Sequence, residues 1–290
     1  HECAAHRARA RRAAPELPRL ALVAMSLFVP YRALGLVAAD DVAFVVNRRG
    51  TESWVTVPLR DSFVVYDCAK LRVTFFGPRF TQGDVSALAT RKNWTFCAVG
   101  RDIMCVKRLH VSCALAGGHA TRVTRMFVFG FYLVSVDEEG VVKVWDIDDD
   151  VMAVREREYE ERRLRNDDMD AEEASESASA SGVEARDVEM PDGFVTTAIA
   201  HPDGYIDKLV FGSADGRMMI MNIRVGKVVY EFAGYGSAVR VVENSPAEDV
   251  VAVGLEDGRV LLVDVAQDKV MFTLSMDSTH TPVTAMAFRT

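Results

Sequence analysis

Cysteine thiols can ligate a metal or attack a substrate, and this sequence holds five of them. They are Cys3, Cys68, Cys97, Cys105 and Cys113. Their number is odd and none forms a CxxC pair, whereas a structural zinc site or a secreted disulfide framework needs paired cysteines. The pattern favours a reducing intracellular compartment, in which buried thiols behave as small apolar side chains.

His119 is the histidine that comes nearest to a candidate for acid–base catalysis. No nucleophile stands at a spacing that would use it, and a structural histidine explains it as well. The sequence also contains no GxxxxGK[ST], HExxH or GxSxG motif, and no pair of carboxylates stands out. We therefore predict a protein that is not an enzyme, with no catalytic residue, cofactor or metal.

The formal net charge of −8 is unevenly placed along the 290 residues. Residues 1–24 carry five arginines against two glutamates, and residues 148–190 carry sixteen acidic residues against six arginines. The rest of the chain is close to neutral, so the acidity belongs to one segment. No run of 18 apolar residues is present, and we expect no transmembrane helix and no membrane partner.

A short pattern, valine followed three residues later by an apolar residue, recurs along the chain and indicates an internal repeat. Its copies begin at Val85, Val123, Val195, Val239 and Val283, which are 38, 72, 44 and 44 residues apart. The long interval contains the acidic stretch. Removing most of that stretch leaves one more unit of similar, though shorter, length.

Turns of an acidic residue and glycine between two apolar runs recur in the same units, and they are typical of tight β-hairpins. Clear copies lie in residues 133–146, 210–222 and 251–264. The runs at 218–221 and 260–263 are apolar on successive positions, as in strands buried on both faces. Units of about 44 residues with four such strands are the blades of a WD-type β-propeller. We predict an all-β, incomplete WD-repeat β-propeller of about five blades plus the first strand of a sixth.

A buried hydrogen-bond set accompanies the best WD repeats, formed by a Gly-His histidine, a strand serine or threonine, a turn acid and a tryptophan. The matching residues in the best-preserved unit are His119, Ser135, Glu139 and Trp145. Glutamate stands where aspartate is usual. Asp215 and Asp257 hold the turn-acid position in the next two units.

Several strings also resemble one particular WD-repeat family. They are residues 27–35, 49–57 and 66–71 near the start, and residues 201–213, 245–254 and 285–290 further along. The family is the tandem-propeller subunit of the UtpB subcomplex of the small-subunit processome. The resemblance covers roughly residues 26–147 and 191–290.

This resemblance implies a non-catalytic scaffold in ribosome biogenesis, which works in the nucleus and nucleolus and is needed to process the precursor of the small-subunit ribosomal RNA. The implied partners are other UtpB-type WD-repeat proteins and processome subunits. The small nucleolar ribonucleoprotein and precursor rRNA would be contacted mostly indirectly. The alternative is a WD-repeat adaptor of another intracellular complex, for example in ubiquitin ligation or transport.

The chain divides into four parts in this interpretation. Residues 1–24 are a disordered basic extension, which we interpret as a gene-model artefact because Met25 follows directly, although its composition also resembles a transit peptide. Residues 25–147 form propeller blades, residues 148–190 an acidic low-complexity insert, and residues 191–290 further blades that are truncated at the C-terminus. The whole chain is therefore expected to be a fragment.

The acidic insert has two halves of different character. Its first half has Arg and Glu at helical spacing and could form a charged helix, while its Ser/Ala/Glu half is typical of disorder. It is either a solvated loop or an acidic arm that grips a basic partner. Ser181, with Glu184 three residues on, is a candidate phosphorylation site that would strengthen such an arm.

Two basic pairs, Arg48-Arg49 and Arg91-Lys92, stand out in the blades. Arg48 and Arg49 are candidates for a rim that touches RNA phosphates or a partner. No stripe of basic residues interleaved with aromatic ones accompanies either pair, and simple solvation of the rim remains the competing explanation.

Overall fold

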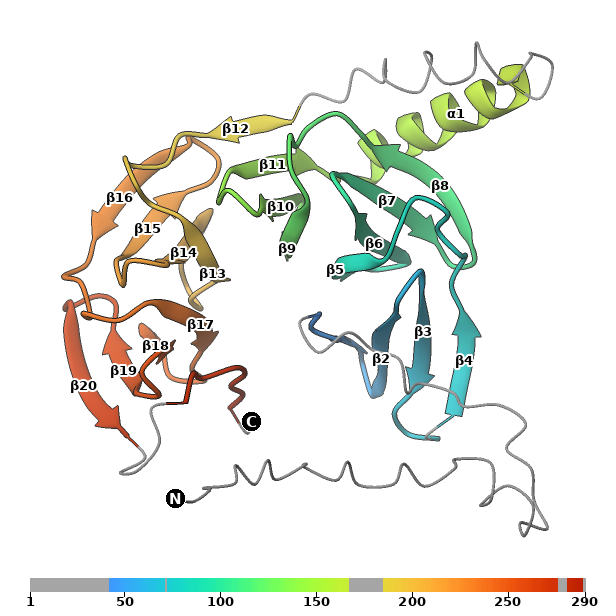
Figure 1. Cartoon of the computed structure of the whole chain (residues 1–290). Helices are drawn as coiled ribbons and strands as arrows, with labels where there is room; N and C mark the ends of the chain where they lie inside the picture. Colours follow the sequence, from blue (N-terminus) through green and yellow to red (C-terminus); the bar gives the residue numbers. More distant parts are fainter. Residues whose placement is uncertain (1–41, 71, 167–184, 276–280, 289–290) are drawn as a thin grey trace, which may run out of the picture. The chain divides into compact units, whose positions relative to one another are not determined.

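The computed structural model describes residues 42–70, 72–166, 185–275 and 281–288. Over these residues the chain forms twenty β-strands and one α-helix. The strands make five four-stranded antiparallel sheets, each built from strands that are consecutive in the sequence. We name these sheets blades A to E in chain order (Figure 1). The predicted extension 1–24 and Ser181 lie outside the described residues.

The blades contain the following strands. Blade A holds β1 (Val45–Arg49), β2 (Glu52–Leu59), β3 (Ser62–Asp67) and β4 (Arg72–Phe76). Blade B holds β5 (Val85–Arg91), β6 (Trp94–Val99), β7 (Asp102–Lys107) and β8 (His110–Leu115). Blade C holds β9 (Val123–Phe129), β10 (Tyr132–Asp137), β11 (Val142–Asp146) and β12 (Arg186–Val188). Blade D holds β13 (Thr196–Ala200), β14 (Lys208–Ser213), β15 (Met218–Asn222) and β16 (Lys227–Glu231), and blade E holds β17 (Val239–Asn244), β18 (Val250–Leu255), β19 (Val260–Asp264) and β20 (Lys269–Leu274).

Several middle strands of the blades are buried on both faces. In β14, β15 and β18 nearly every residue is buried, because neighbouring blades pack against both sides of the sheet. One apolar cluster joins Val134 and Val144 of blade C to Leu209, Phe211 and Met219 of blade D. The prediction of an all-β propeller is therefore confirmed.

The innermost strand of each of blades B to E carries one extra residue, so the register with its neighbour shifts by one. The extra residues are Ser86, Thr124, Thr197 and Arg240. Ser86 Oγ donates to the carbonyl oxygen of Val123 at 2.5 Å, and Thr197 Oγ1 donates to that of Val239. Each of these hydroxyl groups thus ties its blade to the first residue of the next blade.

The repeat predicted to begin at Val195 is displaced by one residue in the structure. Thr196 pairs with Ser213 at the position that Val123 and Val239 hold in their own blades. Thr196 is 5% exposed, whereas Val195 is 39% exposed. The valine pattern was misleading here because the buried first position of blade D is filled by a threonine.

Residues 281–288, predicted to begin a sixth blade, form no regular strand in the described part of the chain. Val283 nonetheless docks on blade E. Its N–H donates to the carbonyl oxygen of Leu255 at 3.1 Å, and a Cβ on Gly254 would lie 2.7 Å from its side chain. The absence of a side chain at Gly254 is what allows this approach.

The first half of the insert folds into α1 (Asp149–Asn166), which packs against β8, as Figure 1 shows. Among the described residues no helix is long and apolar enough to be a membrane span.

Met152 of α1 is fully buried in the same cluster as Trp145. The charged helix predicted for this half is thus confirmed, and the buried Met152 together with ion pairs to blade B fixes the helix to the propeller.

The insert also ends earlier than predicted. Residues 186–188 form β12, the outer strand of blade C, with Val188 paired to Val142 and Lys143 Nζ bonded to Asp187. The predicted boundary at residue 190 is therefore wrong. A strand of three residues with one buried side chain is too short to give an alternating pattern in the sequence.

Candidate functional site

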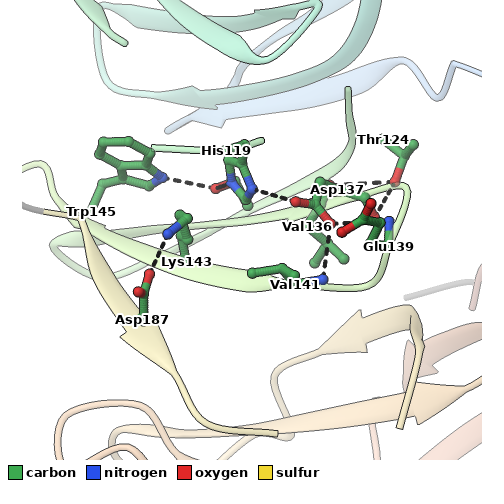
Figure 2. A network of polar contacts seen from close by, with 10 residues as sticks. His119, Thr124, Val136, Asp137, Glu139, Val141, Lys143, Trp145 and Asp187 are labelled. Carbon is green, nitrogen blue, oxygen red and sulfur yellow. Dashed lines mark hydrogen bonds and ion pairs between the residues drawn. The ribbon is translucent and has the colours of Figure 1, made fainter. Parts of the chain in front are cut away.

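A network of buried polar side chains lies in blade C, and Figure 2 shows it from close by. His119, in the loop before β9, contacts Asp137 Oδ2 through Nδ1 at 3.0 Å and Ser135 Oγ through Nε2 at 2.7 Å. Trp145 Nε1, on β11, donates to the same Ser135 oxygen at 2.8 Å. All four side chains are buried.

The direction of each hydrogen bond follows from the groups that take part. An indole N–H and a carboxylate have one role each, donor and acceptor respectively. Trp145 donates to Ser135, the Ser135 hydroxyl donates to Nε2 of His119, and Nδ1–H of His119 donates to Asp137. This arrangement requires the neutral imidazole. Burial lowers the pKa of His119, against the opposing effect of Asp137.

Asp137 takes the place that the sequence analysis gave to Glu139. The Asp137 carboxylate accepts from His119 and from the backbone N–H groups of Glu139 and Val141 at 3.1 and 2.9 Å. Glu139 itself is exposed in the turn. The sequence held a signal for Asp137, because residues two apart on a strand share a face and Asp137 is two residues after Ser135.

Asp215 and Asp257 occupy the turn position of Glu139, as the registers of blades C, D and E show. Each binds the arginine two residues on. Asp215 contacts Arg217 Nε at 2.5 Å, and Asp257 contacts Arg259 Nε at 2.7 Å. The residues that correspond to Asp137 are Ser213 and Leu255. Blades D and E thus close their turns with an Asp–Arg pair in place of the histidine network.

Gly118 has a steric role beside His119. A Cβ at this position would lie 2.2 Å from Cη2 of Trp145, which is far inside van der Waals contact. The tryptophan ring therefore fills the space above the glycine backbone. The Gly-His pair of the sequence combines this close approach with the hydrogen bonds of the imidazole.

The network has a structural character rather than that of an exposed reaction centre. Ser135 and Trp145 are 0% exposed, and His119 is 4% exposed. Each polar hydrogen of the three side chains already has an acceptor inside the network. Over the residues that the structure describes, no group of three or more His, Cys, Asp or Glu side chains is placed to hold a metal ion.

The basic pairs of the sequence have separate surroundings. Arg48 and Arg49 lie on β1, and Arg48 is exposed. Arg91 is only 9% exposed and contacts Asp149 at 3.0 Å, and Lys92 also binds Asp149. The pair at 91–92 therefore anchors the start of α1. This contact could not be predicted from the sequence, because Asp149 lies 57 residues after Lys92.

Five consecutive four-stranded antiparallel sheets, together with the His–Ser–Trp–Asp network of blade C, define a WD-type β-propeller. The crystal structure of the computationally designed Ika8 protein has this fold in common with the chain, with a TM-score of 0.56 and 19% sequence identity over 85% of this chain and 65% of that one. Residues 55–290 match the family described as the WDR36/Utp21 first beta-propeller, and the chain belongs to that family. The family predicted from the sequence is thereby confirmed.

Two relatives resemble the chain over almost all of its length. WD repeat-containing protein 36 from Homo sapiens is 27% identical over 92% of this chain. The U3 small nucleolar RNA-associated protein 21 homolog from Schizosaccharomyces pombe is 26% identical over 91%. The chain spans about a quarter of these relatives, since the matches cover 26% of each.

Proposed function

We propose that this chain is a scaffold domain in ribosome biogenesis, and that it helps to assemble the small-subunit processome that processes the precursor of the small-subunit ribosomal RNA. The observation that carries the proposal is the family match over residues 55–290. Two relatives are named as U3 small nucleolar RNA-associated proteins. Location in the nucleolus follows from the same proposal.

The role is non-catalytic in this proposal. The buried position of His119 and Ser135 supports it, because a substrate would have to reach side chains that solvent hardly touches. Partners would be held on the faces and rims of the blades. The partners proposed are other WD-repeat proteins and processome subunits, with the small nucleolar ribonucleoprotein and precursor rRNA contacted mostly indirectly. Arg48 and Arg49 of β1 are proposed as part of such a rim.

The acidic stretch 167–184 is proposed as an arm for a basic partner. It contains seven acidic residues and no basic ones, and α1 before it is fixed to blade B. Phosphorylation of Ser181 would add to its negative charge. Deleting residues 167–184 tests the arm: recovery of basic partners should fall, and unchanged recovery would remove the idea.

Sedimentation of the tagged full-length protein from nuclear extract tests the main proposal. The fast fractions are probed for precursor small-subunit rRNA and for U3 small nucleolar RNA. Co-sedimentation with both is expected. If the protein stays in light cytoplasmic fractions, the proposal fails and a WD-repeat adaptor of another complex becomes the better explanation.

A further inference from the structure

A cavity of about 300 Å³ lies among the innermost strands of blades B, C and D. Its lining has four hydroxyl groups and two guanidinium groups, contributed by Ser86, Thr124, Thr196, Thr197, Arg122 and Arg125. No aromatic side chain lines it. Ser86 and Thr197 donate their hydroxyl hydrogens to carbonyl oxygens of the next blades, and Thr124 donates to the carbonyl oxygen of Val136. Thr196 and the arginines are therefore the groups left to consider.

Arg125 occupies a position that holds a small apolar residue in blades B and D. Its partner across the sheet is Val136, in the register that pairs Ala87 with Ala98 in blade B and Ala198 with Gly212 in blade D. Ala87 and Ala198 are buried, whereas Arg125 is exposed. Packing of the blades therefore gives no reason for a long cationic side chain at this position.

Thr196 is a polar residue at a position that holds a buried valine in blades B, C and E. The corresponding residues Val85, Val123 and Val239 are buried valines. Thr196 is 5% exposed, and its Oγ1 has no hydrogen-bond partner among the described residues. A buried hydroxyl without a partner costs about 1–3 kcal/mol. Valine would avoid this cost with nearly the same shape.

The charge of Arg125 is not balanced by a neighbour. The other cations nearby are paired: Arg122 with Glu138 at 3.8 Å and Arg240 with Glu256 at 3.1 Å. The Arg125 side chain makes no ion pair or hydrogen bond with any residue that the structure describes.

Two carboxylates, those of Asp137 and Glu138, also line the cavity, and both are already engaged. Asp137 accepts from His119 and from two backbone N–H groups, and Glu138 pairs with Arg122 at 3.8 Å. Loss of hydration in the surrounding protein, followed by the charge of Arg240, lowers the pKa of Arg125. An anion entering the cavity would offset both effects, because its opposite charge favours the charged guanidinium.

We propose that this cavity, the Arg125 cavity, binds an oxyanion on an acidic side chain of a partner's extended peptide. The Arg125 guanidinium supplies the charge and a planar set of donors, and the Thr196 hydroxyl supplies one further donor. The size suits one side chain, and the lack of an aromatic lining disfavours single-stranded RNA, which stacks its bases on aromatic rings. The inference that the partner is a protein rests on the proposed scaffold function.

Fluorescence anisotropy on the full-length protein tests the proposal with three labelled octapeptides. In one, Glu alternates with Ala; in the second, phosphoserine alternates with Ala; in the third, Gln replaces every Glu. Both acidic peptides are expected to bind and to weaken with added salt, and the neutral one is not. The tighter of the two acidic peptides identifies carboxylate or phosphate as the preferred oxyanion.

Two variants and a matched control locate the binding. Arg125→Gln should weaken the acidic peptides about tenfold or more, as expected for loss of a charged hydrogen-bond donor. Thr196→Val should weaken them about threefold while leaving or raising the melting temperature, because it removes an unpaired buried hydroxyl. Arg72→Gln removes an exposed arginine of blade A and should leave binding unchanged.

The proposal is overturned if neither acidic peptide binds, or if Arg125→Gln binds as tightly as the unaltered protein. It is also overturned if a single-stranded oligoadenylate binds in an Arg125-dependent manner and the peptides do not. Sedimentation of Arg125→Gln with precursor rRNA is a separate readout. Peptide binding without processome association would contradict the scaffold function alone, and association without peptide binding would contradict the cavity alone.

Discussion

At the scale of single residues, four buried side chains of blade C form one chain of hydrogen bonds. Trp145, Ser135 and His119 each donate to the next member, and the Asp137 carboxylate accepts the last hydrogen bond. Buried polar groups are stable only when they are paired. Removal of any one member therefore leaves another without its partner.

The role of Asp137 is tested by comparison with Glu139. Asp137→Asn should lower the free energy of unfolding by roughly 2–4 kcal/mol, because it weakens charged hydrogen bonds to His119 and to two backbone N–H groups. Glu139→Gln changes an exposed turn residue and should stay within about 0.5 kcal/mol. Urea unfolding of both variants gives the comparison. A larger effect of Glu139→Gln would restore the acid chosen from the sequence.

The lowered pKa of His119 predicts a loss of stability in acid. In the unfolded chain a histidine takes up a proton below about pH 6.5, while the folded state resists protonation until its own, lower pKa is reached. Stability is thus full above pH 6.5 and falls as the pH drops toward the folded pKa. Melting temperatures of the unaltered protein and His119→Gln should differ less at pH 5 than at pH 8. A difference that grows in acid would contradict the neutral imidazole.

Gly118 offers a sharp steric test with its own counterpart in blade E. Gly118→Ala would place a methyl group 2.2 Å from the Trp145 ring, and overpacking of this kind costs typically about 1–3 kcal/mol. Gly234 stands in the same place before Val239, and a Cβ there meets its nearest neighbour at 3.9 Å. Gly234→Ala should change the melting temperature little. Equal losses in the two variants would speak against the contact.

At the scale of elements, α1 covers the outer edge of blade B. Outer strands expose unpaired backbone groups that invite association, and α1 lies against β8. Lys107 Nζ contacts Glu156 at 2.7 Å, in addition to the pairs of Arg91 and Lys92 with Asp149. Exposed ion pairs contribute little individually, so the buried Met152 is expected to provide most of the anchoring.

Met152→Ala tests this anchoring. It should cost about 2–5 kcal/mol in local or global stability, since Met152 is fully buried. Val154 is 44% exposed on the same helix, and Val154→Ala should have a small effect. Hydrogen exchange of the α1 amides and the melting temperature measure both. Unchanged protection in Met152→Ala would mean that the ion pairs hold the helix.

At the scale of the whole molecule, the outer strand of blade E is open to solvent. Phe272 and Leu274 pair with Leu262 and Val260, share one face of β20 and are 61 and 59% exposed. We expect the purified chain to self-associate at micromolar concentration, and Phe272→Glu to reduce this association through charge repulsion and loss of apolar surface. Light scattering after gel filtration measures the effect. A monomeric unaltered chain would contradict the expectation.

The blades were predictable because their signals are local. A turn such as Asp257-Gly258 joins two strands that follow each other directly in the sequence. A doubly buried strand such as β15 is a run of apolar residues only a few positions long. Asp137 and β12 were missed for a different reason. The histidine partner depends on which face of β10 points inward, and β12 pairs with β11 across an insert of some forty residues. Long-range pairing of this kind leaves little trace in local composition.

The insert of blade C enters at the outer connection, between β11 and β12, while the links between blades run through their innermost strands, as in Ser86 to Val123 and Thr197 to Val239. New sequence can therefore accumulate at the circumference without altering how one blade seats on the next. Recognition elements can evolve there at little risk to folding. Changes to the innermost strands, by contrast, would alter the hydrogen bonds that join one blade to the next.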